Sequence, residues 1–161
     1  MTSLAKNPSL GLVNAWDRLS GLPGGSSVFS FFVGRSARYT GTIGARVLEL
    51  GDGMAQVEMR DRPKVRNHLH SVHAIALMNL GELCTGLAVM SLVDGRGRGI
   101  VSQLSMEYTK KARGTITGRC DAEVPETPGV HDVTATGTLR DATGDVVAVA
   151  TAQWRIEIFE Q

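Results

Sequence analysis

The stretch that decides the fold spans residues 67–82 and reads Asn-His-Leu-His-Ser-Val-His-Ala-Ile-Ala-Leu-Met-Asn-Leu-Gly-Glu. Its histidines come directly before a strongly apolar segment, which predicts a helix from about residues 71–73 to Val93. Apolar side chains surround most of this helix, as is typical of a helix buried on several sides. Glu82 lies in its middle, where a carboxylate is unfavourable unless a partner, a ligand or a water-filled cleft compensates for lost hydration. Glu82 therefore marks either a reaction centre or an ion pair across an interface.

Strands are expected on both sides of the helix. Before it, two strands between about Tyr39 and Arg60 are joined at Gly51-Asp52-Gly53, where glycine allows a tight hairpin. After it, alternating or extended patterns predict four more strands, the last two joined by a hairpin at residues 141–145: Ile100–Lys110, Ile116–Val124, Val130–Arg140 and Val146–Phe159. Residues 94–99, which are rich in glycine, should end the helix and form a loop.

The length of 161 residues predicts one domain of the α+β class, with an antiparallel sheet wrapped around one long central helix. A short amphipathic helix at about residues 9–19 and an apolar element at residues 28–32 form an N-terminal helical extension, assigned to residues 1–36. Residues 37–161 form the main domain. One helix cannot cover the whole sheet, so a homodimer or a dimer of dimers that shelters the sheet edges is expected.

Composition narrows the range of partners. A formal net charge of +1 gives no electrostatic reason to expect nucleic acid or an anionic membrane. The longest apolar segment, Ala74–Val93, is interrupted by Asn79, Glu82 and Thr85, so no membrane helix is expected. No signal peptide is evident, and two cysteines predict buried thiols rather than a disulfide framework, so a cytoplasmic location is expected.

The order of elements resembles the hotdog fold, and three spaced residues sharpen this resemblance. In hotdog acyl-CoA thioesterases of the phenylacetate-pathway type, an Asn precedes a His-Gly-Gly at the helix start, and an acidic residue follows that His inside the helix. Here Asn67 precedes His73 by six residues and Glu82 follows His73 by nine, which matches that spacing. His73-Ala74-Ile75 replaces His-Gly-Gly and Glu replaces the commoner Asp, so the chain looks closest to a less characterised His-Ala…Glu subgroup.

The resemblance implies hydrolysis of a fatty or aryl acyl-CoA. Glu82 would be the general base or the nucleophile. The backbone amide of Ala74, at the helix N-terminus, would stabilise the oxyanion. Asn67 would orient the water or the thioester carbonyl, or would form an Asx-type turn before the helix. His73 would cap the helix or line the pocket.

Coenzyme A would enter as part of the substrate, with no separate cofactor. Its phosphates would contact the basic loop between two strands, at Lys110, Lys111, Arg113 and Gly114. The alternative is that this loop is an ordinary solvated turn, which often has the same composition. Arg96 and Arg98 are weaker candidates. The acyl chain would occupy an apolar tunnel lined by Met78, Leu83, Leu87, Phe29, Phe31 and Phe32. The alternative is that these side chains belong to the hydrophobic core.

Two alternatives have a different chemistry. A non-catalytic acyl-CoA or lipid-binding module, or a regulatory one, is compatible with the same fold, because fold does not establish chemistry. A zinc hydrolase is the other, since His68, His70 and His73 have a His-x-His-x-x-His spacing. The signature that this spacing resembles also needs an acid just before the last His, where this chain has Val72, so no metal site is expected.

Overall fold

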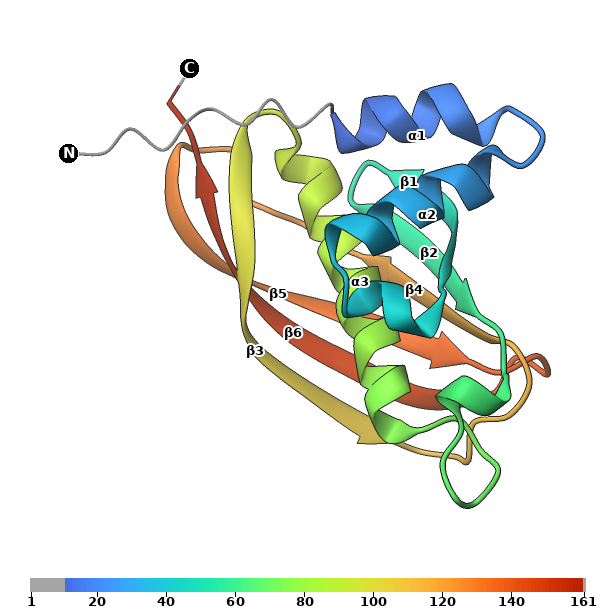
Figure 1. Ribbon diagram of the computed structural model, residues 1–161. Helices are drawn as coiled ribbons and strands as arrows, with labels where there is room; N and C mark the ends of the chain where they lie inside the picture. The colour runs from blue at the N-terminus through green and yellow to red at the C-terminus, as the bar shows by residue number, and fades with distance from the viewer. Residues whose placement is uncertain (1–10, 161) are drawn as a thin grey trace.

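A single six-stranded antiparallel sheet forms one side of the molecule. In the computed structural model, which describes residues 11–160, the strands lie in the order β1-β2-β4-β5-β6-β3 (Figure 1). Their bounds are β1 Arg46–Gly51, β2 Met54–Met59, β3 Gly97–Tyr108, β4 Ile116–Asp121, β5 Gly129–Arg140 and β6 Val146–Ile158. Strands β1 and β3 form the two edges of the sheet, and β3 is twelve residues long.

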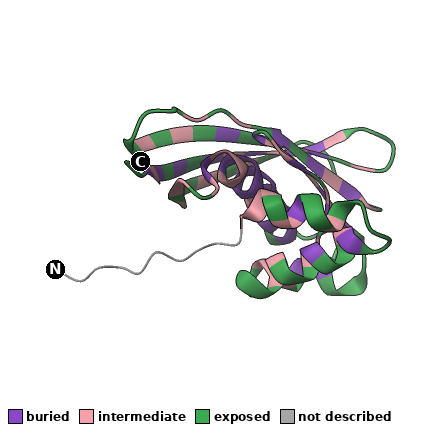
Figure 2. Ribbon diagram, turned by 90° about the horizontal axis from the view of Figure 1, so that it is seen from above, coloured by how far each residue is buried: buried purple, intermediate pink, exposed green. Residues whose placement is uncertain are grey.

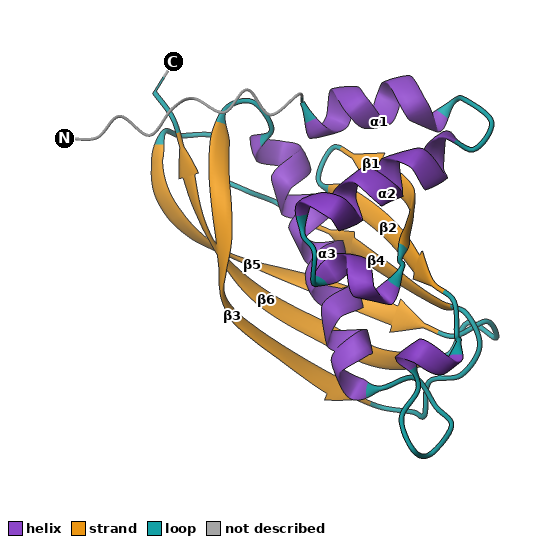
Figure 3. Cartoon of the chain, viewed as in Figure 1, coloured by secondary structure: helices purple, strands orange, loops and turns teal. Residues whose placement is uncertain are grey.

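The long helix α3, Ala74–Val93, lies across one face of this sheet (Figure 3). Its length and composition would suffice to cross a membrane, but most of the helix is buried inside the protein. Close approach is possible because glycines replace side chains at the interface: a Cβ on Gly81 would lie 2.5 Å from the Cβ of Ala150, and one on Gly86 would lie 2.9 Å from the ring of Trp154. The expected antiparallel sheet around one central helix is confirmed.

Two N-terminal helices lie on the same side of the sheet as α3 (Figure 2). Helix α1 spans Leu12–Ser20 and α2 spans Gly25–Ser36, and the rings of Trp16 and Phe29 pack edge to face between them with centroids 5.1 Å apart. The α1 start is tied to the α3 end by a hydrogen bond from Val13 N to Asp94 Oδ2 (3.0 Å). The expected N-terminal helical extension is therefore present, although residues 9 and 10 of its first predicted helix lie outside the described residues.

Several element boundaries differ from those predicted, and strand β4 ends at Asp121 rather than Val124. Residues Thr40–Ile43, placed in a strand from the sequence, form a 3₁₀ helix, η1, because Gly41 packs against the backbone of Gly34 and Gly44 ends the turn at a φ of +58°. Strand β3 begins at Gly97 rather than Ile100, since the glycines expected to form a loop pair with the end of β6. A second 3₁₀ helix, η2, spans Pro63–Val65. Both cysteines are buried, as predicted.

Replacing Gly81 by Ala should destabilise the protein by roughly 1–3 kcal/mol, the usual effect of adding atoms to a well-packed core. The new methyl group would meet the Cβ of Ala150 and the Cε of Met106 (2.9 Å), so α3 would have to lift from β6. Gly21→Ala is the matched control, because a Cβ there meets nothing within 4 Å and the residue has a φ of −76°. Urea unfolding midpoints test this, and equal midpoints for the two variants would contradict it.

Candidate active site

The N-terminus of α3 is organised by His73. This residue is the N-cap, and its Nδ1 accepts a hydrogen bond from Ile75 N at 3.0 Å, so the capping role predicted for it is present. Ala74 is the first helical residue and is exposed, and Tyr108 of β3 donates its hydroxyl to the Ala74 carbonyl at 3.0 Å. Within residues 11–160 the Ala74 amide has no acceptor, so it is available to a ligand at the positive end of the helix dipole.

The Asn67 side chain holds the loop before α3. Its Oδ1 accepts hydrogen bonds from Leu69 N (2.9 Å), Ser71 N (3.2 Å) and Ser71 Oγ (3.2 Å). Of the two roles considered for Asn67, the Asx-type turn is therefore the arrangement seen, and it leaves the Asn67 oxygen fully engaged. Orientation of a water by the remaining amide nitrogen stays a prediction.

The histidines of this loop do not converge. His68 and His70 are exposed, and His70 has a φ of +54° that reflects the tight turn. Across the described part of the chain, no three His, Cys, Asp or Glu side chains are placed to hold one metal ion. The zinc spacing seen in the sequence is therefore not matched by a zinc-binding arrangement in residues 11–160.

Glu82 lies on the wall of a cleft of about 310 Å³ beside α3. Most of the cleft lining is apolar, and Leu83 and Leu87 in it were predicted to meet an acyl chain. The other lining residues are Leu12, Ala37, Thr40, Gly86, Met90, Asp94, Gly95, Gly97 and Trp154. The carboxylate is half-buried, and no hydrogen bond or ion pair to it is present among residues 11–160. Burial raises the pKa of the Glu82 carboxyl above its usual value, and desolvation is the cause.

One chain does not bring Glu82 and the Ala74 amide together. Eight residues separate them, which at the helical rise of 1.5 Å per residue is roughly 12 Å along the axis. A thioester carbonyl held by the Ala74 amide would therefore lie well along the axis from the backbone of Glu82. The residues predicted to act together therefore lie at two places along α3.

Asn79 is a buried polar residue that the sequence showed only as an interruption of the apolar run. It lies one turn before Glu82, and its Nδ2 donates to the carbonyl of Tyr39 at 3.2 Å, which ties the start of η1 to α3. Its Oδ1 is buried without a partner in the described structure. An unsatisfied buried acceptor of this kind typically costs about 1–3 kcal/mol of stability.

The basic loop predicted to bind phosphate is partly neutralised. Lys110 Nζ lies 2.8 Å from Asp141 Oδ2 and 2.6 Å from Asp145 Oδ2, and these hydrogen bonds raise the pKa of Lys110. The Gly114 amide donates to Asp61 Oδ2 at 3.0 Å. Lys111 and Arg113 are exposed, and their contact with phosphate stays a prediction.

Comparison with known proteins agrees with this architecture. The fold is the hotdog fold of thioesterases with solved structures. These include a protein of unknown function from Pseudomonas aeruginosa described as a probable thioesterase (TM-score 0.74, 23% identity, covering 86% of this chain and 97% of that one). A variant of a Staphylococcus aureus thioesterase has a TM-score of 0.66 at 16% identity, covering 74% of this chain and 98% of that one. A Haemophilus influenzae thioesterase also scores 0.66, at 10% identity, covering 76% and 85%.

The sequence itself matches a family profile over residues 25–156, from the start of α2 to near the end of β6. The chain belongs to this family, which is described as a domain of unknown function, DUF4442. No sequence among the curated proteins matches the chain.

Replacing Glu82 by Gln should stabilise the protein at neutral pH. Because burial favours the protonated carboxyl, the folded state binds this proton more tightly than the unfolded chain does. Wild-type stability should therefore fall, relative to Glu82→Gln, as pH rises from the usual value of 4.5 through the raised pKa of Glu82. Urea unfolding from pH 4 to pH 8 tests this, with exposed Glu123→Gln as the control. A pH-independent difference between wild type and Glu82→Gln would contradict it.

Proposed function

We propose that this protein hydrolyses the thioester of a fatty or aryl acyl-CoA. The observation that carries the proposal is Glu82, a partly desolvated carboxylate on the wall of an apolar cleft, with no partner among residues 11–160. The solved structures that share the fold and are named thioesterases support the same class of reaction. Within that class, the spacing of Asn67, His73 and Glu82 favours the phenylacetate-pathway type and its His-Ala…Glu subgroup.

Glu82 would act on the water that attacks the thioester. A carboxylate with a raised pKa is a stronger base, so it would accept a proton from water as the water oxygen bonds to the carbonyl carbon. The carbon–sulfur bond then breaks, the proton passes to the leaving thiolate, and the products are a carboxylic acid and free coenzyme A. If Glu82 instead attacks directly, a mixed anhydride forms and water hydrolyses it.

The Ala74 amide would stabilise the oxyanion that forms on the carbonyl oxygen. A first-turn amide without an acceptor points along the helix dipole and is fixed before the reaction starts. Alanine can replace glycine here because the donor is a backbone group, and His73 holds the turn by capping Ile75.

We infer a homodimer in which the Ala74 amide of one chain meets Glu82 of the partner subunit. The roughly 12 Å of helix axis between Ala74 and Glu82 in one chain favours such an arrangement. Edge strand β3 offers the surface for it: the strand is twelve residues long, Ile100 on it is 67% exposed, and its outer backbone groups are unpaired in the described chain.

Glu82→Gln should lower kcat for acyl-CoA hydrolysis by about 10²–10⁴-fold, the usual contribution of a general base. KM should change little, because the amide fills the same space. The measurement is the rate of hydrolysis of a panel of acyl-CoA thioesters, from acetyl to palmitoyl and with aryl examples, detected by the release of free thiol. Glu123→Gln is the control. Equal hydrolysis by wild type and Glu82→Gln would refute the catalytic role. Binding of acyl-CoA by wild type without turnover would favour the non-catalytic module.

Ala74→Pro should lower kcat by about 10²–10³-fold, because it removes the Ala74 donor while leaving the helix intact. Proline is favoured at the first helical position, and the His73 backbone (φ −66°, ψ 140°) already suits a residue before proline. Ala74→Gly keeps the amide and is the matched control.

Mixing the two inactive variants tests the shared site. A dimer of one Ala74→Pro chain and one Glu82→Gln chain contains one intact amide–carboxylate pair only if the pair spans two subunits. Activity should therefore return after the subunits exchange. A mixture that stays inactive, while each variant still dimerises, would place both groups in the same subunit.

A further inference from the structure

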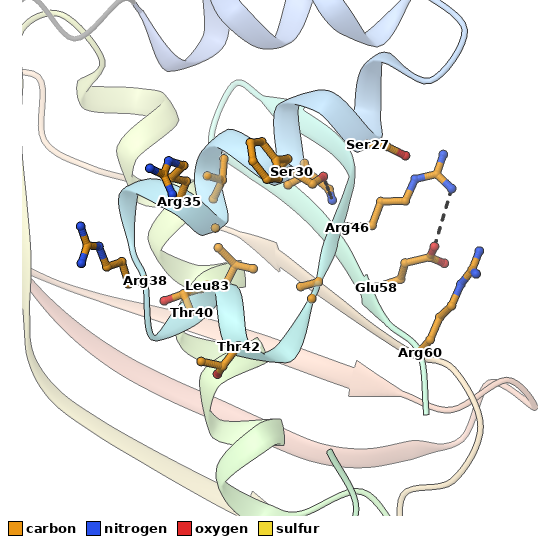
Figure 4. A pocket seen from close by; sticks show the side chains of 17 residues that line it. Ser27, Ser30, Arg35, Arg38, Thr40, Thr42, Arg46, Glu58, Arg60 and Leu83 are labelled. Atoms are coloured by element: carbon orange, nitrogen blue, oxygen red, sulfur yellow. Dashed lines mark hydrogen bonds and ion pairs between the residues drawn. The ribbon is translucent and has the colours of Figure 1, made fainter. Parts of the chain in front are cut away.

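A second, larger cavity lies between α2, η1 and the strands β1 and β2 (Figure 4). Its volume is about 890 Å³, near the upper end of the roughly 300–1,000 Å³ typical of small-molecule sites. Four arginines line it, together with one carboxylate, that of Glu58. The arginines come from α2, from the segment before η1, from β1 and from the residue after β2: Arg35, Arg38, Arg46 and Arg60.

Most of this positive charge has no counter-charge among residues 11–160. Arg46 Nη1 lies 3.9 Å from Glu58 Oε1, at the limit of an ion pair, and Arg46 Nε donates to Ser26 Oγ at 3.1 Å. No carboxylate within residues 11–160 pairs with the other three arginines. Elsewhere on the sheet, arginine side chains lie 2.6–3.0 Å from their carboxylate partners, as at Arg98, Arg119 and Arg155.

The arginines form two groups. Figure 4 shows Arg35 and Arg38 on one flank of the cavity and Arg46 and Arg60 on the other, with Leu83 of α3 between them. Guanidinium groups bind phosphate through paired donors, so two separate groups suit a ligand that carries more than one phosphate. Phe31 also lines the cavity and is 65% exposed, which leaves its ring available to stack on a base.

This cavity adjoins the Glu82 cleft. Thr40 and Leu83 line both of them, and Ala37 lines the cleft while its neighbour Arg38 lines the cavity. A molecule held by the arginines at its anionic end would have to pass Thr40 and Leu83 to reach the apolar cleft. Such a molecule has phosphates at one end and an apolar chain at the other.

We propose that this arginine cavity binds the phosphorylated nucleotide end of the acyl-CoA substrate, an inference that rests on the proposed function for the identity of that substrate. The basic loop at residues 110–114 is the competing location. Two carboxylates hold Lys110 there, whereas three of the four cavity arginines have no such partner in the described chain.

Binding of free coenzyme A, measured by calorimetry, tests the proposal without requiring turnover. The double variant Arg35→Gln/Arg38→Gln should weaken binding by roughly tenfold or more, as expected for losing charged hydrogen bonds. Arg35→Lys/Arg38→Lys keeps the charge but not the paired donors and should lose less. Phe31→Ala should also weaken coenzyme A binding. The control Arg140→Gln/Arg155→Gln removes the same charge from the exposed face of β5 and β6 and should bind as wild type does.

A second measurement separates this proposal from the proposed function. The Arg35→Gln/Arg38→Gln variant should hydrolyse an acyl-pantetheine thioester, which has no nucleotide, as fast as wild type, while its KM for the acyl-CoA rises. Coenzyme A binding that depends on the arginines in a protein without hydrolytic activity would support the cavity and refute the thioesterase.

Three outcomes would overturn the cavity assignment. One is wild-type coenzyme A binding by Arg35→Gln/Arg38→Gln. Another is loss of coenzyme A binding in Lys111→Gln/Arg113→Gln but not in the cavity variant. The third is a cavity variant that binds coenzyme A normally and loses affinity only for an acidic acyl carrier protein, which would make the arginines a protein-docking surface.

Discussion

The close approach of α3 to the sheet sets the position of every other part of the molecule. Glycines permit this approach: Gly81 of α3 lies against Ala150 of β6 and Gly86 against the Trp154 ring, while Gly137 of β5 leaves room for the Thr85 side chain. Dispersion and apolar burial depend on such contact distances, so a helix held even slightly farther away would lose much of its stabilisation. The sheet can then cover one side of α3 completely.

The other side of α3 is also apolar, and it needs a second cover. Helices α1 and α2 with η1 supply one, fixed by the Trp16–Phe29 contact and by the bond from Val13 N to Asp94. This second layer is not continuous. The Glu82 cleft opens where α1, the start of η1, the end of α3 and β3 come together without closing. The cleft is therefore a consequence of covering an all-round apolar helix with two layers of different shape.

The sequence predicted what depends on local pattern. Six strands, the long helix with His73 at its start and the N-terminal helices all follow from periodicity and from turn residues. The η1 turn could not be predicted from the sequence, because it depends on Gly41 packing against Gly34 across a chain reversal. The ion pairs of Lys110 could not be predicted either, since its carboxylate partners belong to the β5–β6 hairpin, which is distant in sequence. Composition alone shows a basic loop there and gives no sign that it is paired.

The arginine cavity also could not be predicted from the sequence, because it depends on contacts between separate segments of the chain. Its four arginines are scattered over residues 35–60 and converge only when α2 packs against β1 and β2. A formal net charge of +1 likewise describes the whole chain and not any part of its surface. Nearly neutral proteins can still hold strong local fields, because most charges pair where the fold brings opposite signs together and a few are left without a partner.

The two sets of charged groups beside α3 remain distinct although their cavities adjoin. An arginine in contact with Glu82 would lower the pKa of its carboxyl, and each group would neutralise the other. Desolvation is instead the cause that raises the pKa of Glu82, and no arginine contributes to the shift. Thr40 and Leu83 form the shared wall. This wall keeps the carboxylate and the guanidinium groups apart, as the proposed function requires of a group that accepts a proton and of groups that hold an anion.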